Sequence, residues 1–117
     1  MPKIFGYQIT SADILKGPLT LLDNQLSPIS LASWPLISVN YVQLQYSLTR
    51  DNLTTTGHIL ITTNGSTTSI SNDEVELLDN LGVTFSSTIV GSSLNLNYTT
   101  TSTGFSATFK YYEKSWL

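Results

Sequence analysis

The sequence predicts an all-β fold, an antiparallel β-sandwich or jelly-roll-like domain preceded by an extended N-terminal arm. After residue 37, apolar and polar residues alternate over several short runs, and this period of two is typical of half-buried strands. Turn signals separate the runs, most clearly Asn64-Gly65, which favours a tight hairpin. The chain contains 17 Thr and 16 Ser, and Thr and the aromatic residues favour pleated sheets. No segment predicts a helix longer than one or two turns.

Residues 37–117 are predicted to form one sandwich domain. Its expected strands cover residues 42–48, 57–63, 66–71, 83–89, 94–99 and 105–111, and residues 75–81 form either a short strand or one helical turn. The alternation places one set of side chains on the buried phase of these strands. The predicted core is therefore Val42, Leu44, Tyr46, Ile59, Ile61, Val83, Phe85, Leu96, Phe109 and Tyr111.

Residues 1–36 are predicted to form an extended arm. All four prolines of the chain lie in its first 35 residues, and proline lacks the N–H group that a central strand must donate. The same segment is rich in apolar side chains, so it is expected to lie on its own sheet or on a neighbouring subunit. Within the arm, residues 11–17 are compatible with one helical turn that begins at Ser11 and ends at Gly17.

Composition narrows the possible partners. The formal net charge is −3 and only 11% of the residues are charged, so the clustered basic side chains that nucleic acid and anionic membranes require are missing. The chain has no cysteine, which excludes disulfides and thiolate metal sites. No stretch approaches the roughly 20 apolar residues of a membrane-spanning helix. A polar surface with so little charge is expected where much of it contacts other subunits.

Catalytic groups are scarce in the sequence. His58 is the only histidine, and no serine lies in a G-x-S-x-G strand-turn-helix motif. The acidic cluster of Asp73, Glu74, Glu76 and Asp79 has the composition of a calcium site, but its spacing does not match an EF-hand loop, and solvated loop carboxylates explain it as well. We therefore expect no enzymatic activity, no cofactor and no metal.

Aromatic and apolar residues outside the predicted core are candidates for an interface. Tyr41 and Tyr112 are out of phase with their apolar neighbours, and Trp116 lies beyond the last predicted strand. Tyr and Trp are enriched in protein interfaces. Together with apolar residues of the arm, these give the predicted interface set of Ile4, Phe5, Tyr7, Leu31, Trp34, Tyr41, Tyr112 and Trp116.

A set of turn and core segments between Val42 and Trp116 resembles a known module. The segments are Leu44-Gln45-Tyr46-Ser47-Leu48-Thr49-Arg50, Thr56-Gly57-His58-Ile59-Leu60-Ile61, Leu81-Gly82-Val83-Thr84-Phe85-Ser86, Leu96-Asn97-Tyr98-Thr99-Thr100-Thr101-Ser102-Thr103-Gly104 and Phe109-Lys110-Tyr111. This order is similar to a β-module that recurs in virion structural proteins of tailed bacteriophages. The layout of an arm and a β-domain is similar to that of phage capsid cement, or decoration, proteins.

The resemblance implies a non-enzymatic virion protein on the capsid surface. It is expected to form oligomers, with a homotrimer favoured, and to bind the phage major capsid protein through its N-terminal arm. Such a protein stabilises the assembled head because it binds the lattice in preference to free subunits. The alternative is a tail-fibre or tail-tip module that binds a host receptor or glycan. That alternative predicts heptads or a collagen-like repeat for fibre attachment, and the first 36 residues contain neither.

Overall fold

The computed structural model describes residues 3–4, 7–8, 15–75 and 81–116, and every regular element in this part of the chain is a strand. The first two strands, β1 (Lys3–Ile4) and β2 (Tyr7–Gln8), pair with each other. The remaining strands are β3 (Leu15–Leu21), β4 (Ile29–Pro35), β5 (Tyr41–Arg50), β6 (Leu53–Thr63), β7 (Thr68–Val75), β8 (Val83–Val90), β9 (Ser93–Thr100) and β10 (Ala107–Trp116).

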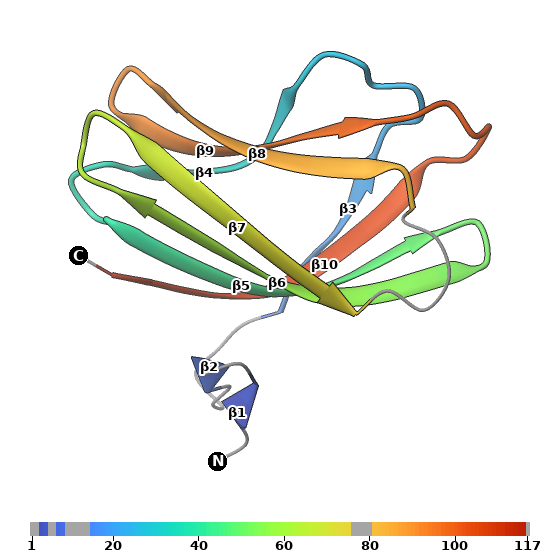
Figure 1. Ribbon diagram of the computed structural model, residues 1–117, viewed down its shortest axis with the longest axis horizontal. Helices are drawn as coiled ribbons and strands as arrows, with labels where there is room; N and C mark the ends of the chain where they lie inside the picture. The colour runs from blue at the N-terminus through green and yellow to red at the C-terminus, as the bar shows by residue number, and fades with distance from the viewer. Residues whose placement is uncertain (1–2, 5–6, 9–14, 76–80, 117) are drawn as a thin grey trace.

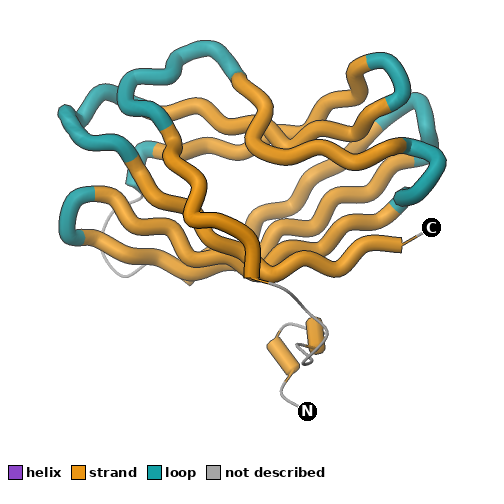
Figure 2. Tube along the Cα trace, turned by 180° about the vertical axis from the view of Figure 1, so that it is seen from behind, coloured by secondary structure: helices purple, strands orange, loops and turns teal. Residues whose placement is uncertain are grey.

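These eight strands form two antiparallel sheets that pack face to face, as expected for a β-sandwich (Figures 1 and 2). The larger sheet has the order β3-β10-β5-β6-β7, and the smaller has the order β4-β9-β8. Tight hairpins join β5 to β6, β6 to β7 and β8 to β9, which fixes the register of these neighbours. The predicted fold class is confirmed.

The core lies between the two sheets and is built by the predicted alternation. Of the ten predicted core residues, Val83 is partly buried and the other nine are buried. Tyr46, Phe85, Phe109 and Tyr111 form a ring cluster in which Phe109 lies 5.3–5.5 Å from the other three ring centroids. The core also includes residues outside the predicted set, among them Leu21, Trp34, Leu94 and Tyr98. Of these, Leu94 and Tyr98 lie on the same predicted face of β9 as Leu96.

Gly57 is required by this packing. It lies opposite Tyr46 on the neighbouring strand, and the Tyr46 ring crosses directly over it. A Cβ atom at Gly57 would come within 2.5 Å of the Tyr46 hydroxyl oxygen and within 2.6–2.8 Å of two of its ring carbons. Because Gly57 has no side chain, the Tyr46 ring can extend across it, and the Tyr46 hydroxyl donates a 2.8 Å hydrogen bond to Asn72 Oδ1 on β7.

The structure corrects the predicted boundary between arm and domain. Residues 15–35 are part of the sandwich, because β3 pairs with β10 in the larger sheet and β4 pairs with β9 in the smaller one. Both are edge strands, where one side of the backbone needs no ladder partner, so Pro18 and Pro35 are tolerated. Proline thus excluded a central position, as predicted, but not a position in the sheet.

Two smaller expectations fall partly outside the described residues. The helical turn predicted for residues 11–17 is contradicted at Leu15, Lys16 and Gly17, which are in β3, and residues 11–14 lie outside the described part. The alternatives for residues 75–81 concern a segment of which only Val75 and Leu81 are described; β7 ends at Val75.

Candidate functional site

One end of the sandwich is organised by a buried arginine at the end of β5. Arg50 is only 3% exposed, and its guanidinium donates hydrogen bonds to main-chain oxygens of two separate loops, β7–β8 and β9–β10. Nε donates to the Phe105 oxygen at 2.9 Å, Nη2 donates to the Thr101 oxygen at 2.6 Å, and Nη1 donates to the Leu81 oxygen at 2.9 Å. A longer contact of 3.5 Å joins Nη1 to the Gly82 oxygen. Arg50 therefore holds these loops together.

Asp23, in the loop between β3 and β4, completes the arrangement. Its Oδ1 accepts a hydrogen bond from Arg50 Nη2 at 2.6 Å, which is also an ion pair. Its two carboxylate oxygens accept from the main-chain N–H groups of Thr103 at 2.9 Å and Gly104 at 3.1 Å. These main-chain bonds, that of Thr103 first, together with Arg50, hold the pKa of Asp23 below its usual value, against an opposing desolvation effect.

The N–H groups of Arg50 and the carboxylate oxygens of Asp23 already form hydrogen bonds within the chain, so they are not available to a ligand. The five guanidinium contacts match the five N–H groups of arginine, so none is left to bind an anion. The pair is a structural clasp. Its function is to fix the shape of the surface around it, and that surface is the candidate site.

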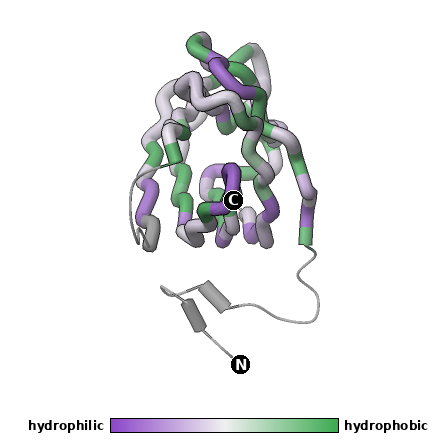
Figure 3. Tube along the Cα trace, turned by 90° about the vertical axis from the view of Figure 1, so that its right-hand side faces the viewer, coloured by the Kyte–Doolittle hydropathy of each residue, from purple (hydrophilic) through white to green (hydrophobic). Residues whose placement is uncertain are grey.

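We call this surface the Arg50 end; it consists of residues 22–28, 51–53, 81–82 and 101–106. Figure 3 looks onto this end of the sandwich, where hydrophobic and hydrophilic stretches lie side by side in the loops. Leu26 is 73% exposed, and Leu22, Phe105 and Leu53 are exposed as well. Large apolar side chains held on a rigid frame are typical of a surface that contacts another protein.

A pocket of about 410 Å³ opens at the Arg50 end. Leu53, Leu81 and Phe105 give it an apolar wall, and Thr101 and Thr103 contribute polar groups. Its full lining is Arg50, Asp51, Leu53, Leu81, Gly82, Thr101, Thr103 and Phe105. Because the arginine donors are already used, the pocket suits an apolar side chain of a partner better than a charged ligand.

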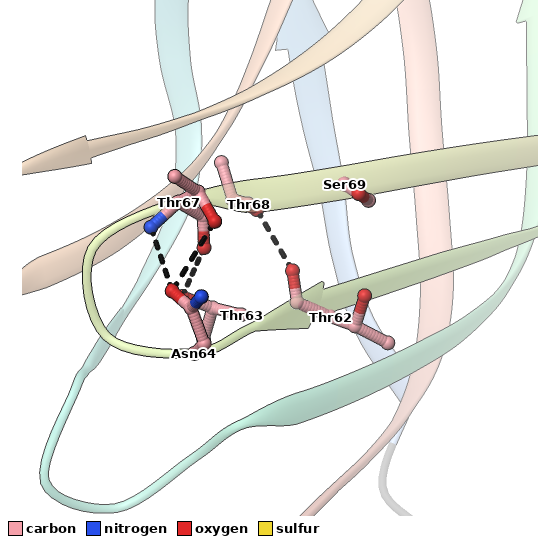
Figure 4. A pocket seen from close by; sticks show the side chains of 6 residues that line it. All are labelled: Thr62, Thr63, Asn64, Thr67, Thr68 and Ser69. Carbon is pink, nitrogen blue, oxygen red and sulfur yellow. Dashed lines mark hydrogen bonds between the residues drawn. The ribbon is translucent and has the colours of Figure 1, made fainter.

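A second pocket, of about 270 Å³, lies at the β6–β7 hairpin and is lined by residues with polar side chains (Figure 4). Its lining residues are Thr62, Thr63, Asn64, Thr67, Thr68 and Ser69. The Asn64 side-chain oxygen accepts from the main-chain N–H groups of Ser66 and Thr67, at 3.0 and 2.9 Å. The hydroxyls of Thr63 and Thr68 bond to main-chain oxygens within the hairpin. These polar groups stabilise the turn, so few of them remain for a ligand.

The structure separates the predicted interface residues. Trp34 is 7% exposed and belongs to the core cluster, so the expectation that it lies on a surface is wrong. Leu31 is partly buried and packs against the core. Trp34 and Leu31 are covered because β4 belongs to the smaller sheet, which places the Trp34 side chain in the sandwich interior and that of Leu31 at its margin.

Tyr41 and Tyr112 are half-buried and lie, as their phase predicts, on the opposite face of the larger sheet from the core. Tyr112 is opposite Gln45 and lines a pocket of about 260 Å³ with Leu15, Gln45, Tyr46, Ser47, Thr56 and Lys110. The backbone of Trp116 pairs with that of Tyr41. The side chains of Trp116, Ile4 and Tyr7, and the whole of Phe5, lie outside the described residues.

His58 and the acidic residues lie on neighbouring strands. His58 is 4% exposed and faces Asp73 across the β6–β7 ladder. Burial lowers the pKa of His58, and the charge of Asp73 partly opposes this shift. Glu74 follows Asp73 in β7, whereas Glu76 and Asp79 lie outside the described part of the chain. Within the described residues, no group of three His, Asp or Glu side chains could hold a metal ion.

Arg50 is not among the predicted site residues, although its position in β5 carries a signal. Arg50 has the same parity as Val42, Leu44, Tyr46 and Leu48, so the alternation of β5 placed a charged side chain on the buried phase. A buried arginine needs several acceptors, which predicts that loops converge on it. The identity of those loops depends on residues 23, 81, 101 and 105, which are far apart in the sequence.

No protein family, curated protein or solved structure matches this chain. Among the described residues there is no helix of the length and hydrophobicity needed to cross a membrane.

Proposed function

We propose that this chain is a non-enzymatic virion structural protein that acts as a bacteriophage capsid cement protein. In this role it binds the assembled head lattice through neighbouring major capsid subunits and stabilises it. The resemblance of residues 42–116 to a phage β-module supports the virion assignment. The low fraction of charged residues supports a surface that is largely covered by other subunits.

The observation that carries the proposal is the apolar surface of the Arg50 end. Leu22, Leu26, Leu53 and Phe105 are exposed at one end of the sandwich, around a pocket with an apolar wall. The clasp of Arg50 and Asp23 fixes the loops that present them, which reduces the entropy lost on binding. A rigid apolar end suits a contact that is repeated at many equivalent positions of a shell, where avidity adds to a weak single contact.

The alternative, a tail-tip module that binds a glycan, has less support. It predicts tyrosines and free polar groups in exposed loops. The tyrosines at 41, 98, 111 and 112 are all in strands, and the hydroxyls of Thr63 and Thr68 in the polar hairpin pocket bond to main-chain oxygens of the hairpin. The cement role is therefore the better explanation of the exposed side chains.

Co-sedimentation with assembled, expanded heads that lack this protein tests the proposal. We expect the full chain to pellet with the heads and Leu26→Ser to bind at least tenfold more weakly. Ile37→Ser is the matched control, because Ile37 is 84% exposed but lies in the β4–β5 turn at the opposite end of the sandwich. No binding by the full chain, or equal loss in the two variants, would contradict the proposal.

A further inference from the structure

The Arg50 end contains two acidic residues, Asp23 and Asp51, and they differ in what balances their charge. Asp23 is paired with Arg50, whose guanidinium contacts all go to other groups than Asp51. Asp51 is exposed, lines the pocket of about 410 Å³, and takes part in no ion pair among the described residues. The loops of this end contain no basic residue. The pocket therefore carries a net negative charge.

The position of Asp51 is set by its turn. Its φ angle is 57°, in the left-handed region that Asp and Asn tolerate better than most residues. Arg50 and Leu53, which flank the turn, lie opposite each other in the β5–β6 ladder. Arg50 is in addition held by the clasp. The turn is thus fixed at its base, and Asp51 is kept beside the apolar wall of the pocket.

Any occupant of the pocket displaces water from Asp51 as well as from the apolar wall. The wall of Leu53, Leu81 and Phe105 favours an apolar side chain. Loss of water around a carboxylate is unfavourable unless a positive charge or a hydrogen-bond donor takes its place. Because the loops of the Arg50 end supply no positive charge, the partner has to supply it. An acidic partner would instead add repulsion between like charges.

We propose that the Arg50 end binds a segment of its partner protein in which an apolar side chain lies next to a lysine or arginine. The apolar side chain fills the pocket, and the basic side chain pairs with Asp51 at the rim. Such an exposed pair adds little affinity, but it rejects acidic segments and speeds association. The inference rests on the proposed function for the identity of the partner, the major capsid protein, and adds the chemistry of the segment bound.

Two capped tetrapeptides serve as probes of the pocket in the absence of heads. Both have glycine at the ends and leucine at the second position, and the third position is lysine in one and glutamate in the other. In NMR titrations of the isotope-labelled full chain at low salt, the lysine peptide should shift the amide signals of Leu53, Leu81 and Phe105. It should bind about threefold or more tightly than the glutamate peptide. At about 1 M salt, where the Debye length is about 3 Å, this preference should disappear.

Asp51→Asn shows whether the preference comes from this carboxylate. Asparagine has nearly the same shape and tolerates the same φ angle, so the fold should be kept, and the variant should bind both peptides equally. Asp73→Asn is the matched control, because it removes the same charge from an exposed aspartate in β7, outside the Arg50 end, and it should retain the preference.

Three results would overturn the inference. They are the absence of shifts at the three amides, equal affinity of the unchanged chain for the two peptides, and a preference that Asp51→Asn and Asp73→Asn affect to the same extent. Because the titrations use no heads, each of these results would leave the cement function itself to be decided by co-sedimentation. Conversely, a chain that prefers the lysine peptide but does not pellet with heads would keep the pocket chemistry and lose the capsid partner.

Discussion

Truncation of Phe109 removes the side chain at the centre of the core. Phe109 is fully buried in β10, and its ring lies 5.3 Å from that of Tyr46, 5.5 Å from that of Phe85 and 5.4 Å from that of Tyr111. Each sheet is stiffened by its own inter-strand hydrogen bonds, so the cavity left by Phe109→Ala cannot collapse freely. We therefore expect Phe109→Ala to lower the free energy of unfolding by about 3–5 kcal/mol.

That loss is a large part of the whole stability of the domain, since the free energy of unfolding of natural domains is about 5–15 kcal/mol. Urea denaturation measures it, with the fluorescence of buried Trp34 as the probe of unfolding. Phe105→Ala is the control, because Phe105 is 49% exposed and its truncation should cost less than about 1 kcal/mol. A loss below about 1 kcal/mol for Phe109→Ala would show that the assigned core is wrong.

Three further predictions concern the N-terminal third and the clasp. Deletion of residues 1–14 should leave a cooperative thermal transition, whereas deletion of residues 1–35 should abolish it by removing two edge strands and the core residues Leu21 and Trp34; a folded 36–117 fragment would contradict the edge-strand assignment. Arg50→Met should lower the free energy of unfolding by about 3–5 kcal/mol in urea denaturation, because it leaves part-buried main-chain oxygens and the Asp23 carboxylate without the charged partner they bind; an unchanged midpoint would contradict the clasp. Because the pKa of Asp23 is lowered in the folded chain, its contribution to stability is fully present above the ordinary carboxyl pKa and is lost as the pH falls through the lower pKa of the folded state. Asp23→Asn should therefore reduce the loss of thermal stability at acid pH, and an unchanged pH dependence of the melting temperature would contradict the assignment.

The alternation of apolar residues was sufficient to predict the central strands and their buried faces. Strands β5, β6, β9 and β10 each bury the side chains that their phase assigned to the core. This succeeds because a period of two is imposed directly by the pleat, and each strand is long enough for the pattern to be seen.

The edge strands were harder to predict, for a physical reason. Pro18 and Pro35 signal that a segment cannot be central, but an edge strand and a free arm are equally compatible with that signal. The edge-strand arrangement is favoured over a free arm because Leu21 and Trp34 can be buried between the two sheets, and this depends on side chains of the opposing sheet. The clasp was hidden for the same reason, since Arg50 meets acceptors from loops far away in the sequence.

The capsid role is tested most directly by the thermal stability of the heads themselves. Calorimetry of expanded heads lacking this protein would be compared with that of the same heads saturated with the full chain. Because a ligand that binds only the assembled lattice stabilises it by mass action, the temperature of head disruption should rise with the concentration of the chain until the sites are filled. A disruption temperature that stays constant at all concentrations would contradict a cementing function.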